Sequence, residues 1–154
     1  MRVNDIVVRL AGREDLRLFD RVVDDVFDEP IDAALLREFL DDPRHHLAVA
    51  LGPANEVIGF ASTVHYVHPD KRPQLFINEV GVAAPWQGRK LGTRLLRVLL
   101  DQARTLGCTE AWVLTDADNA AACALYRSAG GRAQPTVMFT LPVAVDRPPA
   151  VAED

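Results

Sequence analysis

The sequence lacks the features that mark secreted and membrane-spanning proteins. Its only two cysteines, Cys108 and Cys123, fall in a predicted loop and a predicted helix, which argues against a disulfide framework and favours a reducing compartment. No apolar run approaches the roughly 20 residues that a spanning helix needs. The amino terminus has charges on both sides of a very short apolar run, so we expect no signal peptide. We therefore expect a cytoplasmic protein with no membrane partner.

Basic residues are also fewer than acidic residues. The 154 residues hold 17 Lys and Arg against 22 Asp and Glu, for a formal net charge of -5, which argues against nucleic acid as the main partner. Hydrophobic residues make up 49% and charged residues 25%, as in ordinary globular domains. We predict one domain over residues 1–141, and over 142–154 a Pro-rich tail that we expect to be mobile. The oligomeric state stays open, with a homodimer among the alternatives.

The histidines do not predict a metal site. His65 and His68 are three residues apart in or near a predicted strand, where such residues face opposite sides. No cysteine or clear carboxylate completes a ligand set with them or with the pair His45 and His46. We therefore predict that the protein binds no metal.

The apolar periodicity predicts a strand, two helices, three antiparallel strands, a helix, a strand, a helix and a strand. In that order the segments are 6–10, 14–27, about 31–40, 46–51, 57–67, 75–82, 91 to just before Gly107, 111–115, 120–129 and 137–141. The predicted fold class is α/β of the α+β type, with a mixed, mostly antiparallel central sheet flanked by helices.

The central feature of the chain is a turn between a strand and an amphipathic helix, reading Gln87-Gly88-Arg89-Lys90-Leu91-Gly92-Thr93. Its glycines let the backbone approach a ligand closely, and the unpaired amides of a helix start point outward. Such a helix start binds anions, and Arg89 and Lys90 add positive charge. Neither the nucleoside-triphosphate loop nor the dinucleotide fingerprint occurs. The turn predicts a phosphate or pyrophosphate ligand, and hence a diphosphate cofactor.

Glu79 lies in the strand that leads into this turn. Strict alternation places it on one face with Leu75, Ile77 and Gly81, and so among apolar neighbours. A carboxylate there is either desolvated, with a raised pKa, or turned into a cleft, and both suit a general base. The alternative is a charge on the solvated face of an ordinary strand.

The densest acidic cluster, residues 24–32, lies between the first two predicted helices and includes Asp25, Asp28 and Glu29. Two interpretations stay open for it. It is either a solvated loop or a surface that attracts a cationic substrate.

Three separated pieces of the chain resemble the Gcn5-related N-acetyltransferase (GNAT) family. Residues 87–92 are similar to its Q/R-x-x-G-x-G/A turn, with Lys90 where the pattern has its middle glycine, and the Glu79 strand precedes that turn. Asn119-x-x-Ala122-x-x-Leu125-Tyr126 matches the family's N-x-x-A-x-x-L-Y pattern at every fixed position. The predicted order of elements is also the layout of the GNAT fold. Because glycine adopts positive φ easily, Lys90 makes the loop conformation the point to test.

The resemblance implies an N-acetyltransferase that uses acetyl-CoA and acts on a primary amine of a small molecule. It implies that Glu79 is the general base, that Tyr126 is the general acid, and that the sheet splays at the acetyl-CoA site. It implies cofactor contacts from Val80, Gly81, Val82, Gln87, Gly88, Arg89, Lys90, Leu91, Gly92, Thr93, Asn119 and Tyr126. We place substrate contacts at Asp25, Asp28, Glu29 and Glu79. The alternatives are a core aromatic for Tyr126 and a simple helix cap for Asn119.

Within the family, TVHYVHPDKRPQLFINEVGV and LYRSAGGRAQPTVMFTL look most like the aminoglycoside 3-N-acetyltransferases, which implies a role in antibiotic resistance. A protein or peptide N-acetyltransferase and a non-catalytic acyl-CoA-binding module are the alternatives. The presence of both Glu79 and Tyr126 disfavours the non-catalytic module. The acidic cluster mildly favours a polycationic acceptor over a neutral peptide end.

Overall fold

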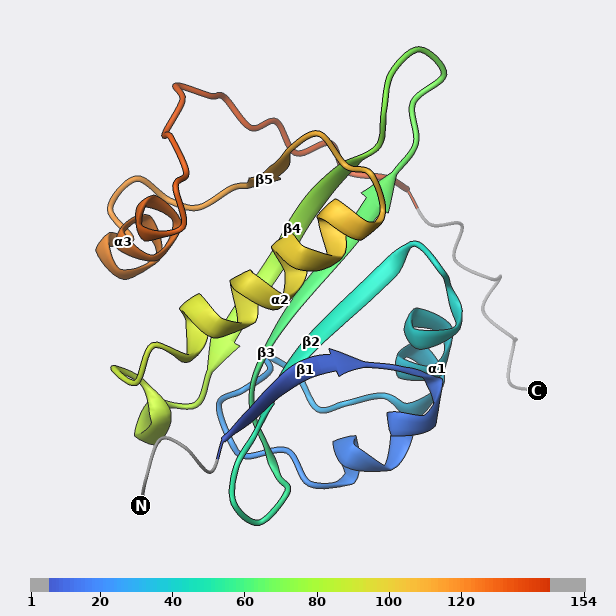
Figure 1. Ribbon diagram of the computed structural model, residues 1–154, viewed down its shortest axis with the longest axis vertical. Coiled ribbons are helices and arrows are strands. Elements are labelled where there is room, and N and C mark those ends of the chain that lie inside the picture. The colour runs from blue at the N-terminus through green and yellow to red at the C-terminus, as the bar shows by residue number, and fades with distance from the viewer. Residues whose placement is uncertain (1–5, 145–154) are drawn as a thin grey trace, which may run out of the picture.

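The computed structural model describes residues 6–144, which are built around a five-stranded sheet in the order β1-β2-β3-β4-β5 (Figure 1). The strands are β1 Val7–Ala11, β2 His45–Leu51, β3 Val57–Tyr66, β4 Gln74–Val82 and β5 Ala111–Val113. The first four pair antiparallel in sequence order, whereas β5 pairs parallel with β4 after a helical crossover. The predicted mixed, mostly antiparallel sheet is therefore confirmed.

The helices are η2 Arg13–Asp20, α1 Ala33–Asp41, η3 Ala84–Trp86, α2 Leu91–Thr105 and α3 Ala120–Ser128. The longest, α2, lies over one face of the sheet, roughly along the direction of β4, and packs on β1 to β4 (Figure 1). Its residues Leu91, Leu95 and Leu99, four apart, are at most 2% exposed, and each such burial is worth about 1.5–3 kcal/mol. Within residues 6–144, no helix is long and apolar enough to cross a membrane.

Different parts of the chain cover the two faces of β3. A Cβ on Gly59 would lie 3.6 Å from Leu95 Cδ1 of α2. The next residue, Phe60, points the other way and stacks on Phe27 with ring centroids 3.9 Å apart. The face opposite α2 is thus covered by the segment that joins η2 to α1.

A β-bulge in β4 corrects the predicted environment of Glu79. Glu79 pairs with Ser62 and Ile77 pairs with Thr63, so Asn78 is an extra residue between them. Because Ser62 and Thr63 point to opposite faces, Ile77 and Glu79 do so too. Ile77 is buried and Glu79 is exposed. The prediction that they share an apolar face was wrong, because strict alternation fails at a bulge.

The helix predicted over 14–27 ends early, at the end of η2. The next residues leave the helix to form a β-bridge between Val22 and Val57. In this bridge the Val23 N–H donates to the Val57 carbonyl at 2.9 Å, and the Val57 N–H donates to the Arg21 carbonyl at 2.8 Å. Val26, one of the apolar residues predicted to lie on a helix face, is nevertheless buried, with 4% of its surface exposed. It lies in a loop instead.

The strand predicted over 137–141 was also wrong, because residues 131–144 have no regular secondary structure. A strand needs a hydrogen-bonded neighbour, and this segment has none within the described part of the chain. Most of the predicted tail, residues 145–154, lies outside the described residues. The single domain over 1–141 stays a prediction.

Candidate functional site

The turn before α2 presents a row of free backbone N–H groups. Across the described residues, no protein acceptor pairs with the amides of residues 88–93, and α2 has no side-chain cap at its amino end. Gly88 has φ 74, and a Cβ there would meet nothing within 4 Å. An open row of amides at a helix start suits a phosphate or pyrophosphate group. These residues therefore fit a diphosphate cofactor such as acetyl-CoA.

Lys90, the N-cap of α2, has φ 59 and ψ 23, which is the left-handed conformation. Glycine adopts this conformation freely, whereas another residue gives up roughly 1–2 kcal/mol. The replacement of the motif glycine by Lys90 therefore changes the side chain and adds strain, while the left-handed backbone is kept.

Two side chains predicted as cofactor contacts also have partners in the protein. Gln87 Nε2 donates to the Val82 carbonyl at 3.0 Å and ties the turn to the end of β4. The Arg89 guanidinium lies over the Trp86 ring, 5.0 Å from its centroid. Because Trp86 is buried, its ring gives the Arg89 guanidinium a fixed surface to rest on.

Gly92 is where α2 meets α3. A Cβ at Gly92 would lie 3.1 Å from Leu125 Cδ2, which is tighter than ordinary contact. The sequence suggested that Gly92 is small to admit a ligand. In the structure, the missing side chain of Gly92 also makes room for Leu125, so that α3, the helix that carries Tyr126, can pack on α2.

β4 and β5 pair only over a short stretch, from Leu75 with Ala111 to Ile77 with Val113. β5 then ends, while β4 continues through its bulge to Val82. Beyond Ile77, β4 has no strand partner on its β5 side within the described residues. The predicted splay of the sheet is thus confirmed, and it lies immediately before the turn with the free amides.

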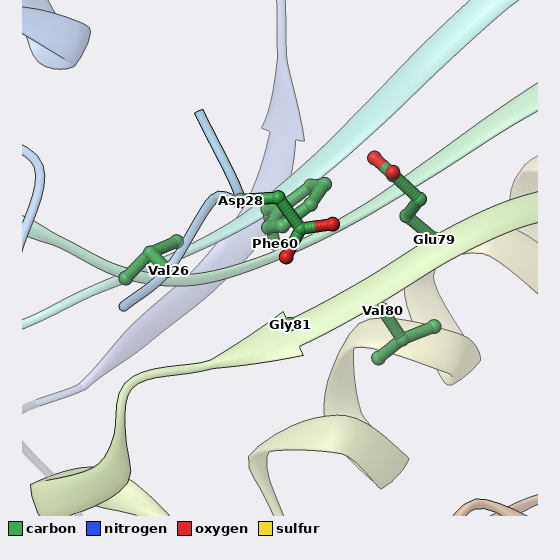
Figure 2. A pocket seen from close by; sticks show the side chains of 6 residues that line it. All are labelled: Val26, Asp28, Phe60, Glu79, Val80 and Gly81. Atoms are coloured by element: carbon green, nitrogen blue, oxygen red, sulfur yellow. The ribbon is translucent and has the colours of Figure 1, made fainter. Parts of the chain in front are cut away.

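A pocket of about 210 Å³ lies on the Glu79 side of β4, lined by Val26, Asp28, Phe60, Glu79, Val80 and Gly81. Figure 2 shows the Glu79 and Asp28 carboxylates on the same side of the strand as Phe60, with Val80 pointing away. A Cβ at Gly81 would lie 2.5 Å from the Val26 carbonyl oxygen. The acidic segment therefore lies directly on β4.

A second, larger pocket opens against the segment that joins η2 to α1. Its lining includes five carboxylates, from Asp20, Asp24, Asp25, Asp28 and Glu29. Asp28 lines both pockets and so connects this acidic surface to Glu79. Asp25, Asp28 and Glu29, three of the four substrate contacts predicted from the sequence, line this pocket, and the fourth, Glu79, lines the smaller one.

Tyr126 lies half-buried on α3 and does not line the Glu79 pocket. Its burial, and secondarily the nearby Cys123, raise the pKa of its phenol above the ordinary value of 10.0. Asn119 Oδ1 accepts a hydrogen bond from the Ala122 N–H at 3.1 Å, which makes Asn119 the N-cap of α3. A cofactor contact from Asn119 remains a prediction.

A histidine pair that strand periodicity alone does not predict lies between β2 and β3. His46 Nε2 lies 2.8 Å from His65 Nδ1, so one ring donates and the other accepts. Burial, with His65 and His45 nearby, lowers the pKa of His46 to about 4. In the part of the chain that the structure describes, no three or more His, Cys, Asp or Glu side chains gather as metal ligands would.

Comparison with known proteins agrees with this architecture. The model of the acetyltransferase (GNAT) family matches residues 13–130, so the chain belongs to the GNAT family. The N-alpha-acetyltransferase RimI of Mycobacterium tuberculosis is 36% identical over 105 residues, which cover 68% of this chain and 63% of RimI. The match thus spans less than two thirds of that relative's length.

Solved structures with similar folds include aminoglycoside acetyltransferases. One from an uncultured soil metagenomic sample, in complex with trehalose, has a TM-score of 0.79 at 20% identity, with 92% of this chain and 98% of that chain covered. AAC(6')-Iy in complex with the bisubstrate analogue CoA-S-monomethyl-acetylneamine has a TM-score of 0.73 at 19% identity, covering 90% and 99%. At these identities the likeness shows the fold alone. The likeness to 3-N-acetyltransferases stays a prediction.

Proposed function

We propose that this protein is an acetyl-CoA-dependent N-acetyltransferase whose acceptor is a primary amine of a polycationic small molecule, such as an aminoglycoside. The observation that carries the proposal is the connection, through Asp28, between the acidic pocket and the pocket that holds Glu79. The acidic pocket attracts positive charge, and the Glu79 pocket holds a carboxylate beside the splay of the sheet.

The amides of residues 88–93 would hold the pyrophosphate of acetyl-CoA, with help from Arg89 and Lys90. When bound, acetyl-CoA supplies an acetyl group as an activated thioester. The edge of β4 beyond Ile77, which is unpaired on its β5 side, would leave backbone groups free to bind the acyl end of the cofactor. A backbone amide near Val80 is our candidate for stabilising the developing oxyanion.

Glu79 is our candidate for the general base. An ammonium has no lone pair, so the acceptor amine must lose a proton before it attacks. Glu79 is exposed in its pocket and can take that proton directly or through a water molecule. The nearby Asp28 carboxylate would favour binding of the charged amine, and Glu79 would then remove the proton.

Tyr126 is our candidate for the general acid. A thiolate leaving group is best protonated as it departs, and a tyrosine phenol, with an ordinary pKa of about 10, carries a proton to donate at neutral pH. The contact of Leu125 with Gly92 holds α3 against the start of α2. This contact would keep the tyrosine beside the cofactor turn.

A protein N-terminal acetyltransferase is the second candidate, and the 36% identity to an enzyme named N-alpha-acetyltransferase favours it. A peptide terminus carries one amino group, so it gains less from five clustered carboxylates than a polycation does. A non-catalytic acyl-CoA-binding module would need neither Glu79 nor Tyr126.

A thiol-release assay with acetyl-CoA separates these functions. The acceptor panel contains aminoglycosides, polyamines and peptides with free amino termini, each tested with wild type and with Glu79→Gln. We expect the highest kcat/KM for a polycationic small molecule and a large loss in the variant. Preferred turnover of peptides would favour the second candidate, and acetyl-CoA binding without turnover of any amine would favour the module.

A further inference from the structure

Ser62 is a polar residue in the buried part of β3. It is 6% exposed, and its hydroxyl oxygen has no hydrogen-bond partner among the residues that the structure describes. Every residue of β3 from Val57 to Thr63 is buried. Native proteins pair nearly all buried hydroxyls, because an unpaired one has lost its bonds to water and gained none in return. An unpaired hydroxyl at this position therefore costs stability and points to a functional role.

Glu79 is the residue opposite Ser62 on the neighbouring strand, β4. Opposite residues of an antiparallel pair share a face of the sheet, with Cβ atoms roughly 4.5–5.5 Å apart. A glutamate carboxylate can reach a serine hydroxyl over that separation. On β2, the partner of Ser62 is Leu47, whose side chain has no polar atom. Of the two side chains paired with Ser62, only that of Glu79 can accept its hydrogen bond.

The β-bulge at Asn78 creates this pairing. Thr63 pairs with Ile77, so a β4 without the extra residue would place Asn78 opposite Ser62. The bulge moves Glu79 into that position and turns its side chain to the Ser62 face. Bulges are common next to active sites, where they re-aim a side chain. This one brings the proposed general base to a buried hydroxyl donor.

We propose that Ser62 is a positioning residue, whose hydroxyl donates a hydrogen bond to the Glu79 carboxylate and holds it toward the acceptor amine. The inference rests on the proposed role of Glu79 as the general base. In the structure the two groups are not bonded, and a change of the Glu79 rotamer brings them together. Glu79 is exposed, so an unanchored carboxylate would move among rotamers, whereas proton transfer needs one geometry.

Other nearby polar groups suit this role less well. Asp28, the other carboxylate that lines the Glu79 pocket, accepts hydrogen bonds when ionised and so does not donate to Glu79. The Thr63 hydroxyl is on the opposite face of β3 from Ser62, and it donates to the His46 carbonyl at 3.4 Å. Thr63 is 2% exposed and is therefore a matched control for the removal of a buried hydroxyl.

The first test separates a positioning role from a structural one. Ser62→Ala removes a buried hydroxyl that has no partner in the described chain, so we expect the melting temperature to stay the same or rise. With acetyl-CoA and the panel amine of highest kcat/KM, we expect kcat to fall by roughly tenfold to 10²-fold, the scale for a misplaced catalytic group. KM for both substrates should stay nearly the same.

Two further variants complete this test. Ser62→Thr keeps a hydroxyl and should recover most of the lost kcat. Thr63→Val removes the neighbouring hydroxyl from its partner and should lower the melting temperature while kcat stays at the wild-type value. Wild-type kcat in Ser62→Ala, or an equal loss of kcat in Ser62→Ala and Thr63→Val, would overturn the proposal.

A double-mutant cycle tests whether Ser62 acts through Glu79. Adding Ser62→Ala to Glu79→Gln should lower kcat by less than about twofold, because the group that Ser62 positions is already gone. If the added change lowers kcat as much as it does in wild type, Ser62 acts independently and only this inference fails. Wild-type turnover in Glu79→Gln would overturn the role of Glu79 itself and this inference with it.

A measurement without turnover tests the contact directly. The ¹³C NMR signal of the Glu79 carboxylate is recorded in the full chain labelled at glutamate and is identified by its loss in Glu79→Gln. Because a donated hydrogen bond changes the chemical shift of a carboxylate, we expect this signal to move in Ser62→Ala and to stay in place in Thr63→Val. A signal that stays in place in Ser62→Ala would overturn the proposed hydrogen bond, whether or not the protein acetylates any amine.

Discussion

Gly92 and Leu125 face each other where α2 and α3 meet, with Leu125 Cδ2 3.1 Å from the place where a Gly92 Cβ would lie. The turn before α2 and the helix that carries Tyr126 therefore meet at this contact. If the turn binds acetyl-CoA, we expect a change at Gly92 to weaken binding by two routes, because an added side chain narrows the turn and displaces α3.

We expect Gly92→Val to weaken acetyl-CoA binding severely and to destabilise the fold by roughly 1–3 kcal/mol, the usual cost of overpacking. Titration calorimetry and thermal unfolding measure the two effects. Adding Leu125→Ala to this variant should restore much of the stability, because it removes the clash with the new side chain. Any acetyl-CoA affinity that the second change restores would have been lost through the displacement of α3, and the remaining loss would come from the narrowed turn. An unchanged affinity in Gly92→Val would contradict the assignment of the turn as the cofactor site.

Lys90 should respond to glycine differently from alanine. Lys90→Gly relieves the left-handed strain of roughly 1–2 kcal/mol but adds roughly 0.5–1 kcal/mol of chain entropy cost, so we expect a small gain in stability. Lys90→Ala removes the same charge and keeps the strain, which makes it the control. Chemical unfolding that ranks the alanine variant equal to or above the glycine variant would show that the strain is not significant.

We expect Tyr126→Phe to keep the fold and acetyl-CoA affinity while kcat falls by roughly 10² or more, the scale for losing a positioned acid. The control is the only other tyrosine, Tyr66, at the end of β3. Its hydroxyl donates a hydrogen bond to Gln74 Oε1 and accepts one from Trp112 Nε1. Tyr66→Phe should change stability and leave kcat nearly unaltered. Wild-type turnover in Tyr126→Phe would make Tyr126 a packing residue only.

The histidine pair predicts a loss of stability in mild acid. His46 has a pKa of about 4 in the folded protein and about 6.5 when unfolded, so between these values the unfolded chain binds more protons. The contribution of His46 to stability is therefore present above about pH 6.5 and is lost as the pH falls toward 4. Unfolding free energies of wild type and His46→Gln should converge or cross over this range. Parallel pH profiles would contradict the assigned pKa.

The sequence predicted those features that depend on local pattern. The burial of Leu91, Leu95 and Leu99 follows from helical periodicity, and the capping of α3 by Asn119 follows from residue chemistry. The side chain of Glu79 was misplaced because the bulge at Asn78 depends on pairing with β3, which strand alternation does not contain. The early end of η2 likewise depends on a bridge to distant Val57.

Two contacts could not be predicted from the sequence, that of His46 with His65 and that of Gly92 with Leu125. His46 and His65 are 19 residues apart and meet only because β2 and β3 pair in one register. Gly92 meets Leu125 only after α3 has packed on α2. The segment predicted as a strand over 137–141 has the composition of a strand but has no hydrogen-bonded strand neighbour within residues 6–144.

The acidic pocket predicts how KM for the acceptor amine depends on salt concentration. The carboxylates of Asp25, Asp28 and Glu29 are exposed, so each pair with a substrate cation is worth under about 1 kcal/mol, but several act together on a polycation. Added salt shortens the Debye length from about 10 Å at 0.1 M to about 3 Å at 1 M, so KM for a polycationic amine should rise while acetyl-CoA affinity changes less.

Neutralising these three carboxylates, as Asp25→Asn, Asp28→Asn and Glu29→Gln together, should raise KM for a polycationic amine and flatten its salt dependence. Affinity for acetyl-CoA should stay nearly the same, because residues 87–93, the proposed cofactor turn, line neither pocket. The matched control removes three exposed carboxylates that line neither pocket, from Glu14, Glu38 and Asp70. If both triple variants raise KM equally, the effect comes from net charge alone. If neither does, the acidic segment is a solvated loop and the polycationic acceptor loses its physical support.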